Sequence, residues 1–579
     1  KTGNTAFTFP TGNSGIYRPV AISAPGVASH QFRAQYFFAA QAFGSNLDPT
    51  FTSISSCEYW TVDRTIGTSN VTLTLGWNSM DCAGPYITSL PETRVARWTG
   101  AVWENLGNGG TTGDVDSGTI VTSAAVTSFS PFTIATAAVP GDYRSAATGN
   151  WNVLANWERW NGTDWVTPTA GQGTPGATSG NIQIRSAHNI TLTTNLEVDQ
   201  LTINGTLTLN SGITLSAGPN PIMMVVNGTV NNPAASTISS SISNAFYNPG
   251  SLYIHNTTAA NGGVVPTANW NVASTLRIAL TQNQNHTFTS TSWSQAFGNV
   301  EVDIVHGAMG GPKNHNFNGL LTTVNGNLSF LNIGGGPPST VTLAGAGSHT
   351  INIGRDLILN IDGNVDKALI LNGAGGTTTV NLSGDFIASR GTLNSSGQGD
   401  LVFSSSALRN FTRAAANNSI TGNVNFIIPS NAIVNFGTSA IEGDGSFSLS
   451  GEMRMQHVQG LDDVLLNTGA KNFNANSTIT YNGSTDQEFG TLYPASPAAG
   501  INVVVNKAAG ILSTSSANTS ITGALRLLAG TLDIATVAPS DNTLSLNGHV
   551  EISAGLLAGN AEAILSIGGA GTLDQINFA

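Results

Sequence analysis

The chain has 579 residues, with 20 Lys and Arg against 32 Asp and Glu, and a formal net charge of −12. It contains no cluster of basic residues and no apolar run of about 18 residues, which argues against nucleic-acid binding and against a membrane-spanning segment. Only 9% of residues are charged, while Gly accounts for 67 positions, a composition that suits strands joined by tight corners and disfavours long helices.

The first part of the chain, residues 1–139, contains short alternating stretches separated by turn signals. Such spacing predicts an antiparallel β-sandwich. The two cysteines of the chain, Cys57 and Cys82, both fall here. They could be buried thiols, but we predict a disulfide because the rest of the chain has an extracellular character. The predicted strands are 30–38, 56–62, 71–77, 94–98, 118–122 and 132–135.

A tryptophan-rich junction follows at 140–180. Its segment 159–165 repeats the Arg-Trp-x-Gly pattern of 97–103, which indicates a second hairpin with one Trp on each arm. Because the first coil of a solenoid needs an apolar cover, we expect this junction to form a cap. Trp160 and Trp165 could instead stack on sugars and are the candidate carbohydrate-binding residues.

From residue 181 to 579 one short phrase recurs, in which apolar residues alternate with polar ones around a glycine corner. Period-two alternation predicts strands with one buried face, and we expect the glycines to supply the backbone angles of sharp bends. The uneven spacing of the phrase favours a long, irregular right-handed parallel β-helix, with about 14–18 coils of roughly 22–28 residues. Alternation still runs at the last residues, so we expect the helix to continue beyond Ala579 in a longer protein. Stretches that lack the alternation, where a ligand site would be sought first, are 231–250, 259–269, 308–316 and 493–500.

Few residues in the coil region suggest chemistry. Asp362, Asn364 and Asp366 have the spacing of a calcium loop, but Lys367 stands where such a loop has Gly, so a polar turn is the favoured explanation. The one adjacent acid pair, Asp462 and Asp463, reads as a solvated corner rather than as catalytic carboxylates. The nine histidines show no metal-ligand spacing along the sequence, so no catalytic residue and no cofactor is predicted.

Several phrases resemble very large secreted and cell-surface repeat proteins of Bacteroidota. The segments that carry the resemblance are Phe7-Thr8-Phe9-Pro10-Thr11-Gly12, Tyr17-Arg18-Pro19-Val20, Cys57-Glu58-Tyr59-Trp60, Arg94-Val95-Ala96-Arg97-Trp98, Ser128-Phe129-Ser130-Pro131-Phe132-Thr133, Tyr143-Arg144-Ser145 with Gly149-Asn150-Trp151-Asn152, and Thr480-Tyr481-Asn482-Gly483-Ser484-Thr485-Asp486-Gln487. The resemblance covers most of the chain and carries no enzymology. It implies export by the type IX secretion system and a role in adhesion, gliding motility or extracellular filaments.

Together these features predict a non-enzymatic, extracellular structural or adhesive protein of a bacterial cell surface, a stiff stalk or fibre subunit. Its partners would be the rest of a longer chain, further subunits end to end, or surface glycans. Two alternatives stay open. One is a carbohydrate-binding surface module, and the other is a β-helix enzyme that degrades polysaccharides, which would need at least two carboxylates converging on a cleft.

Overall fold

The computed structural model describes residues 2–44, 46–78, 81–82, 87, 89–129, 131–217, 223–233, 236–239, 244–305, 311–334, 336, 338–361, 366–414, 416–494, 500–514, 518–534, 542–569 and 571–573. The protein is almost entirely β, with 51% strand and 3% helix. Two compact units are present, Lys1–Ile254 with Pro266–Ser274, and His255–Val265 with Thr275–Ala579. An antiparallel region at the N-terminus precedes a parallel β-solenoid of about 14 turns, so the predicted fold class is confirmed.

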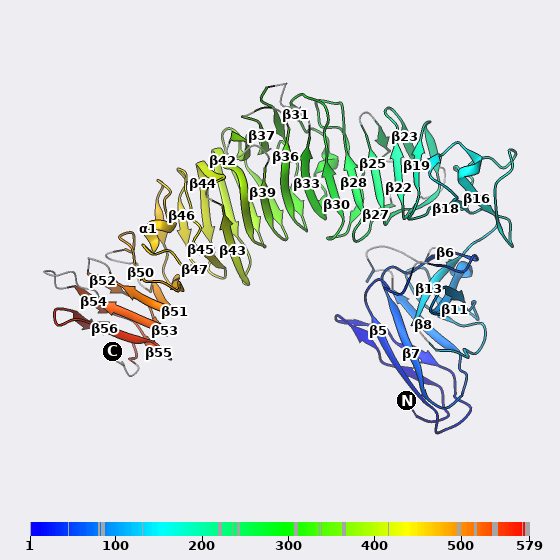
Figure 1. The fold of residues 1–579 in the computed structure, drawn as a ribbon, viewed down its shortest axis with the longest axis horizontal. Coiled ribbons are helices and arrows are strands. Elements are labelled where there is room, and N and C mark those ends of the chain that lie inside the picture. Colours follow the sequence, from blue (N-terminus) through cyan, green and yellow to red (C-terminus); the bar gives the residue numbers. More distant parts are fainter. Residues whose placement is uncertain are drawn as a thin grey trace. The chain divides into compact units, whose positions relative to one another are not determined.

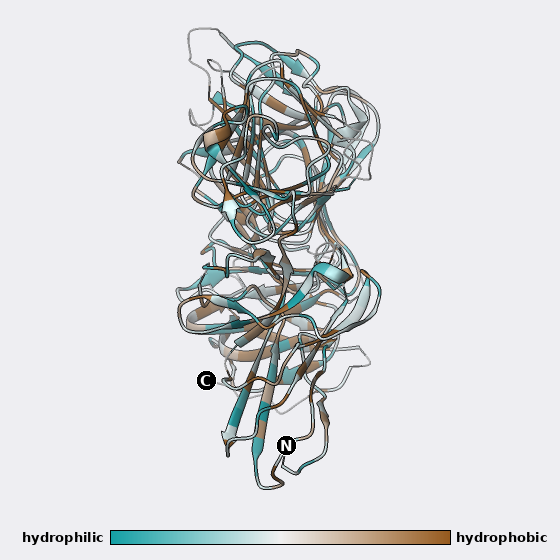
Figure 2. Ribbon diagram, turned by 90° about the vertical axis from the view of Figure 1, so that its right-hand side faces the viewer, coloured by the Kyte–Doolittle hydropathy of each residue, from teal (hydrophilic) through white to brown (hydrophobic). Residues whose placement is uncertain are grey.

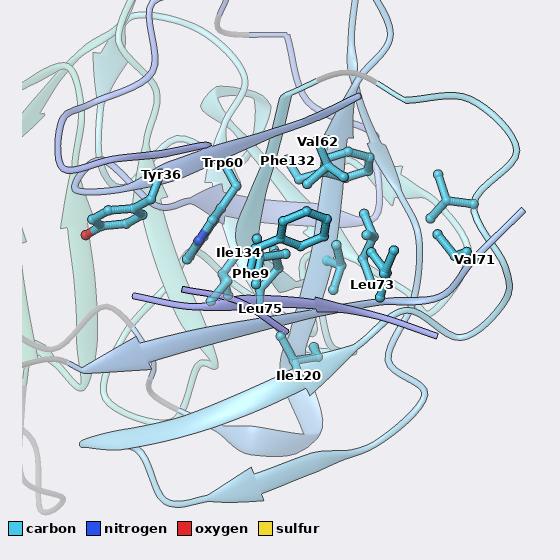
Figure 3. Close-up of a cluster of buried hydrophobic side chains, with 14 of the residues drawn as sticks. Phe9, Tyr36, Trp60, Val62, Val71, Leu73, Leu75, Ile120, Phe132 and Ile134 are labelled. Carbon is cyan, nitrogen blue, oxygen red and sulfur yellow. The ribbon is translucent and has the colours of Figure 1, made fainter. Parts of the chain in front are cut away.

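The N-terminal region of the first unit contains two large antiparallel sheets (Figure 1), besides the short pair β2 (Gly12–Asn13) and β3 (Ile16–Tyr17). Their inward residues form one core that includes Trp60, Phe132 and Leu75, all 0% exposed (Figure 3). The hairpin predicted at 97–103 is present, with Trp98 opposite Trp103. One sheet has the order β1 (Phe7–Phe9), β4 (Val20–Ile22), β8 (Leu73–Asn78), β12 (Ser117–Val121) and β11 (Thr111–Gly113). The other has the order β10 (Trp103–Asn105), β9 (Thr93–Trp98), β13 (Pro131–Ala137), β7 (Tyr59–Ile66) and β5 (Gln31–Phe37), with β6 (Phe51–Ile54) also paired to β13.

The tryptophan-rich junction starts the solenoid. Strand β14 (Tyr143–Ser145) pairs antiparallel with β16 (Trp157–Trp160) and parallel with β18 (Asn181–Ile184). It therefore marks the point where the pairing changes from antiparallel to parallel. Trp151 and Trp157 are buried here and meet edge to face with ring centroids 4.7 Å apart.

Parallel coils then stack in register through the rest of the first unit. Along β18, β21, β24 and β27 each strand pairs with the equivalent strand one coil later, so inward residues such as Ile182, Leu201 and Met224 lie above one another. The strands of this sheet are β21 (Gln200–Ile203), β24 (Met223–Val226), β27 (Asn244–Tyr247) and β29 (Asn269–Trp270). A second sheet contains β15 (Gly149–Asn150), β19 (Asn189–Leu192), β22 (Thr206–Leu209) and β25 (Thr229–Asn232), and a third contains β20 (Leu196–Val198), β23 (Thr214–Ala217) and β26 (Thr237–Ile238).

The second unit continues the same kind of stack with longer strands. In Figure 1 its strands β33 (Asn299–Ile304), β36 (Leu328–Ile333) and β39 (Leu357–Asn360) lie side by side. Hydropathy colouring shows hydrophobic and hydrophilic positions interspersed along the strands (Figure 2). Ile190 pairs with Leu207, 17 residues later, and Ile351 pairs with Val380, 29 residues later. The coils therefore vary in length more widely than the 22–28 residues expected. Later strands include β42 (Phe386–Phe403), β44 (Asn418–Ile428), β51 (Asn502–Ser513), β53 (Leu525–Ile534) and β57 (Ile564–Ile567), and the helix α1 covers Leu461–Val464.

The corner glycines differ from the expectation. Most of them do not have the positive φ that a left-handed bend requires, and Gly422 is the exception among those in the recurring phrase, with φ of 66°. A Cβ on Gly205 would instead lie 2.2 Å from the carbonyl oxygen of Arg185, and one on Gly228 would lie 2.1 Å from that of Gly205. Glycine is therefore required because the backbone of one coil lies directly against the backbone of the coil before it.

Candidate functional site

The first unit contains a groove of about 830 Å³. One wall is the outer face of the solenoid sheet β18–β21–β24–β27, and the other comes from β6, β13 and the segment after β5. We call this cavity the inter-sheet groove. Its volume lies within the range of about 300–1,000 Å³ that is common for ligand clefts.

Regular strand pairing positions the solenoid wall of the groove. Gln183 is in register with Thr202, Thr202 with Val225, and Val225 with Phe246. Their neighbours in the sequence point inward and are buried, so these four side chains point outward from consecutive coils. They form one row along the groove.

An asparagine ladder borders the row at the adjacent corner. The side-chain amide of Asn227 donates to Asn204 Oδ1 at 2.7 Å, and that of Asn248 donates to Asn227 Oδ1 at 2.7 Å. All three asparagines line the groove. Within the ladder Asn204 only accepts, Asn248 only donates, and Asn227 does both once, so hydrogen-bonding capacity remains toward the groove.

Polar contacts connect the two walls. Gln183 Nε2 donates to the carbonyl oxygen of Thr52 at 2.5 Å. The indole N–H of Trp165 donates to the carbonyl oxygen of Pro49 at 2.6 Å. Asp142, which is buried between the two regions, accepts the backbone N–H groups of Val139 and Asn181. Burial raises the pKa of this carboxyl group to about 6.

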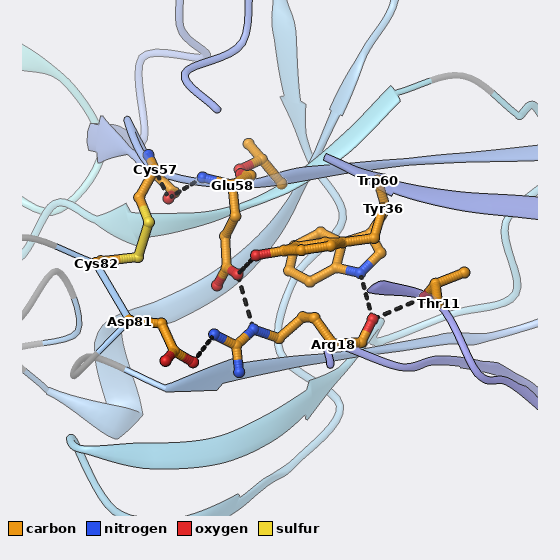
Figure 4. Close-up of polar contacts among 10 residues, drawn as sticks. Thr11, Arg18, Tyr36, Cys57, Glu58, Trp60, Asp81 and Cys82 are labelled. Atoms are coloured by element: carbon orange, nitrogen blue, oxygen red, sulfur yellow. Dashed lines mark hydrogen bonds and ion pairs between the residues drawn. A yellow bond between two sulfur atoms is a disulfide. The ribbon is translucent and has the colours of Figure 1, made fainter. Parts of the chain in front are cut away.

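A buried charge network lies behind the sandwich wall (Figure 4). Arg18 pairs with Glu58 at 2.8 Å and with Asp81 at 2.7 Å, and Tyr36 donates to the same Glu58 oxygen at 2.8 Å. Burial alone would lower the pKa of Arg18, but Glu58 and Asp81 raise it above its usual value. Asp81, the one carboxylate among the described lining residues, is thus paired with Arg18, which it shares with Glu58.

The predicted disulfide between Cys57 and Cys82 is present at this wall, with Cα atoms 5.8 Å apart. Trp160 and Trp165 form the predicted hairpin in β16 and β17 (Trp165–Val166), with their rings 5.4 Å apart. Trp160 is 4% exposed, and the guanidinium of Arg144 lies 4.4 Å from the Trp165 ring. Trp160 therefore presents little surface to a sugar, whereas Trp165 is half-buried, with Arg144 against its ring.

The other candidates of the sequence analysis do not converge. Asp362 and Asn364 lie outside the described residues, whereas Asp366 is exposed at a shallow hollow in the second unit. Asp462 accepts the backbone N–H groups of Thr491 and Leu492, and Asp463 is part-exposed beside His457. Within the described part of the chain, no three His, Cys, Asp or Glu side chains gather as metal ligands would.

Two internal clusters could not be recognised from linear spacing. His286 and His315 are 29 residues apart, yet their Nδ1 atoms lie 3.1 Å apart inside the solenoid. The ammonium group of Lys507 donates to the carbonyl oxygens of Gly483 and Thr485 and to Gln487 Oε1. Burial lowers the pKa of Lys507 to about 8. The segment 480–487 therefore surrounds the ammonium group of Lys507, which comes from the next coil.

The groove residues Gln200, Thr202 and Phe246 were not predicted as site residues. One signal was available, because Phe246 is an aromatic residue at an outward position between the buried Ala245 and Tyr247. It falls in the stretch 231–250, which was expected to be an irregular insert, but it belongs to the regular strand β27.

Comparison with family models, with curated proteins and with solved structures finds no match to this chain. Among the described residues, no helix is long and apolar enough to cross a bilayer.

Proposed function

We propose that this protein is a non-enzymatic structural component of a bacterial cell surface, a stiff stalk or adhesive fibre. The observation that carries the proposal is the stack of parallel coils, in which each strand bonds the equivalent strands before and after it. Such a stack transmits load along its axis through many parallel hydrogen bonds and leaves few open strand edges.

Side chains at one corner of the second unit reinforce the stack. Asn327 Oδ1 accepts the backbone N–H of Asp356, Asp356 Oδ1 accepts that of Asp385, and Asp385 Oδ1 accepts that of Asn410. Each of these bonds joins two successive coils, and a bond of this kind stabilises by about 1 kcal/mol.

Two further observations support the extracellular and non-catalytic parts of the proposal. The Cys57–Cys82 disulfide fits an oxidising compartment. Asp81 is the sole carboxylate among the described residues of the inter-sheet groove, whereas glycosidic chemistry needs a pair.

Single-molecule stretching tests the mechanical role. Attachment points at the exposed turn residues Asn210 and Glu562 would apply load along the coils. We expect stepwise lengthening of about 65–100 Å per coil, since each coil between the attachment points releases some 19–29 residues. Smooth extension at negligible force would contradict the proposal. In cells, antibody labelling before and after lysis should detect the protein on intact cells, and an exclusively internal protein would refute the surface location.

A further inference from the structure

The inter-sheet groove has the chemistry of a site for an uncharged, hydroxyl-rich ligand. Its described lining contains no Lys, Arg or His, and its single carboxylate is paired with Arg18. A phosphate, a nucleic acid or an acidic polysaccharide would find no cation there to compensate its charge. The polar groups that do line the groove are amides and hydroxyls.

We propose that the inter-sheet groove binds a neutral polysaccharide that runs along the solenoid axis. In this arrangement the ring of Phe246 stacks on the C–H face of a sugar. Gln200 and Thr202, together with the Asn204–Asn227–Asn248 ladder, exchange hydrogen bonds with its hydroxyl groups. An aromatic face combined with donor and acceptor amides matches the two kinds of surface that a sugar ring presents.

The repeat of the solenoid favours an extended polymer over a compact ligand. Successive coils are about 4.8 Å apart, a spacing comparable to the length of one sugar ring. The outward row of Gln183, Thr202, Val225 and Phe246 and the parallel asparagine ladder both advance by one residue per coil. Consecutive sugars would therefore meet equivalent positions on consecutive coils.

The same geometry disfavours a peptide on the solenoid wall. An extended peptide gains affinity mainly by pairing with an open strand edge. Strand β21 pairs with β18 and β24 on its two sides, and β24 pairs with β21 and β27. This wall offers side chains to a ligand, and its backbone hydrogen-bonding groups are already used.

Calorimetric titration of the purified 579-residue chain tests the proposal. The probes are the neutral hexasaccharides of cellulose, laminarin, mannan and xylan, and the acidic hexamers of polygalacturonate and alginate. We expect at least one neutral probe to bind with little dependence on salt. Phe246→Ala should weaken that binding about tenfold, the effect of losing one aromatic contact, and Gln200→Ala should weaken it several-fold.

Matched controls separate the site from general effects on folding. Tyr17→Ala removes an aromatic side chain that is 64% exposed outside the groove. Thr208→Ala removes an outward polar side chain of β22, on the neighbouring sheet, and is the control for Gln200→Ala. Both controls should leave binding unchanged. The side chain of Gln200 is half-buried on the outer face of β21, so its removal should not affect folding. Gln200→Ala therefore tests the groove even where Phe246→Ala fails to fold.

Several outcomes would overturn the proposal. These are absence of binding by every neutral probe at millimolar concentration, tighter and salt-sensitive binding of an acidic probe, or binding that survives both groove variants. A change from dimer to monomer on Phe246→Ala would show that a second copy of the chain fills the groove. These outcomes are independent of the stalk proposal. Groove variants that fold correctly should show the same stretching steps between Asn210 and Glu562 as the parent chain.

Discussion

The buried imidazole of His255 predicts that part of the second unit opens in mild acid. His255 is 1% exposed, its Nε2 lies 2.9 Å from the carbonyl oxygen of Gly262, and its ring meets Trp293 edge to face. Burial, aided by the nearby His286, lowers its pKa from 6.5 to about 4. The folded state therefore holds the neutral ring, whereas the unfolded segment takes up a proton below pH 6.5.

The size of the effect follows from the pKa difference. The difference between a pKa of about 4 in the folded state and 6.5 in the unfolded segment, at about 1.4 kcal/mol per pKa unit, corresponds to roughly 3–4 kcal/mol. This stability is fully present above pH 6.5 and is lost as the pH falls toward 4. The local opening equilibrium should then rise about 100-fold between pH 7 and pH 4.

Hydrogen exchange measures this opening directly, because the backbone N–H of Ala279 donates to the carbonyl oxygen of His255. Exchange of a peptide covering residues 275–281, corrected for the intrinsic pH dependence, should accelerate in acid. The His255→Gln variant can still donate to Gly262 but does not titrate near neutral pH, so it should lack most of the acceleration. Equal pH profiles for the two proteins would refute the reasoning, since His286 and His315 are present in both.

Three further perturbations test other parts of the fold. Replacing Cys57 and Cys82 together by Ser should lower the unfolding free energy of the sandwich by about 3 kcal/mol, measured as an earlier urea midpoint, and an unchanged midpoint would contradict a stabilising role. Gly205→Ala should cost about 1–3 kcal/mol because its Cβ would meet carbonyl oxygens of the previous coil. Gly171→Ala, with nothing within 4 Å, is its control, and thermal melts that shift equally would disprove the close-stacking explanation. Asp385→Ala should speed hydrogen exchange at the next coil by about fivefold or more, whereas Asp385→Asn, which keeps the accepting oxygen, should resemble the parent.

Much of the fold could be predicted because local patterns determine it. Alternation in 200–209 determines which side chains point inward, and the Trp-Gly-Trp spacing of the two hairpins places their turns. The corner glycines were located correctly but for the wrong reason, since a strand pattern does not reveal how closely the next coil approaches. That distance depends on register between residues about 20 positions apart.

The groove could not be predicted for the same reason. It forms where the sandwich faces the solenoid sheet, and its polar residues resemble every other outward Thr, Asn and Gln of the chain. The pairing of His286 with His315, and of Lys507 with the phrase at 480–487, likewise depends on which coils are neighbours. Spacing along the sequence identifies metal or cation sites only when their members lie close together in one segment.

The close backbone stacking at Gly205 and Gly228 also bears on how such a protein changes over evolutionary time. Because each coil contacts chiefly the coils before and after it, removing or duplicating one whole coil preserves the contacts on both sides of the splice. Removing or duplicating a coil in this way preserves the stack only when a glycine still lies against the carbonyl groups at the corner. A gene encoding such coils could therefore lengthen or shorten its product in units of one turn, and unequal coils could persist side by side without a common repeat length.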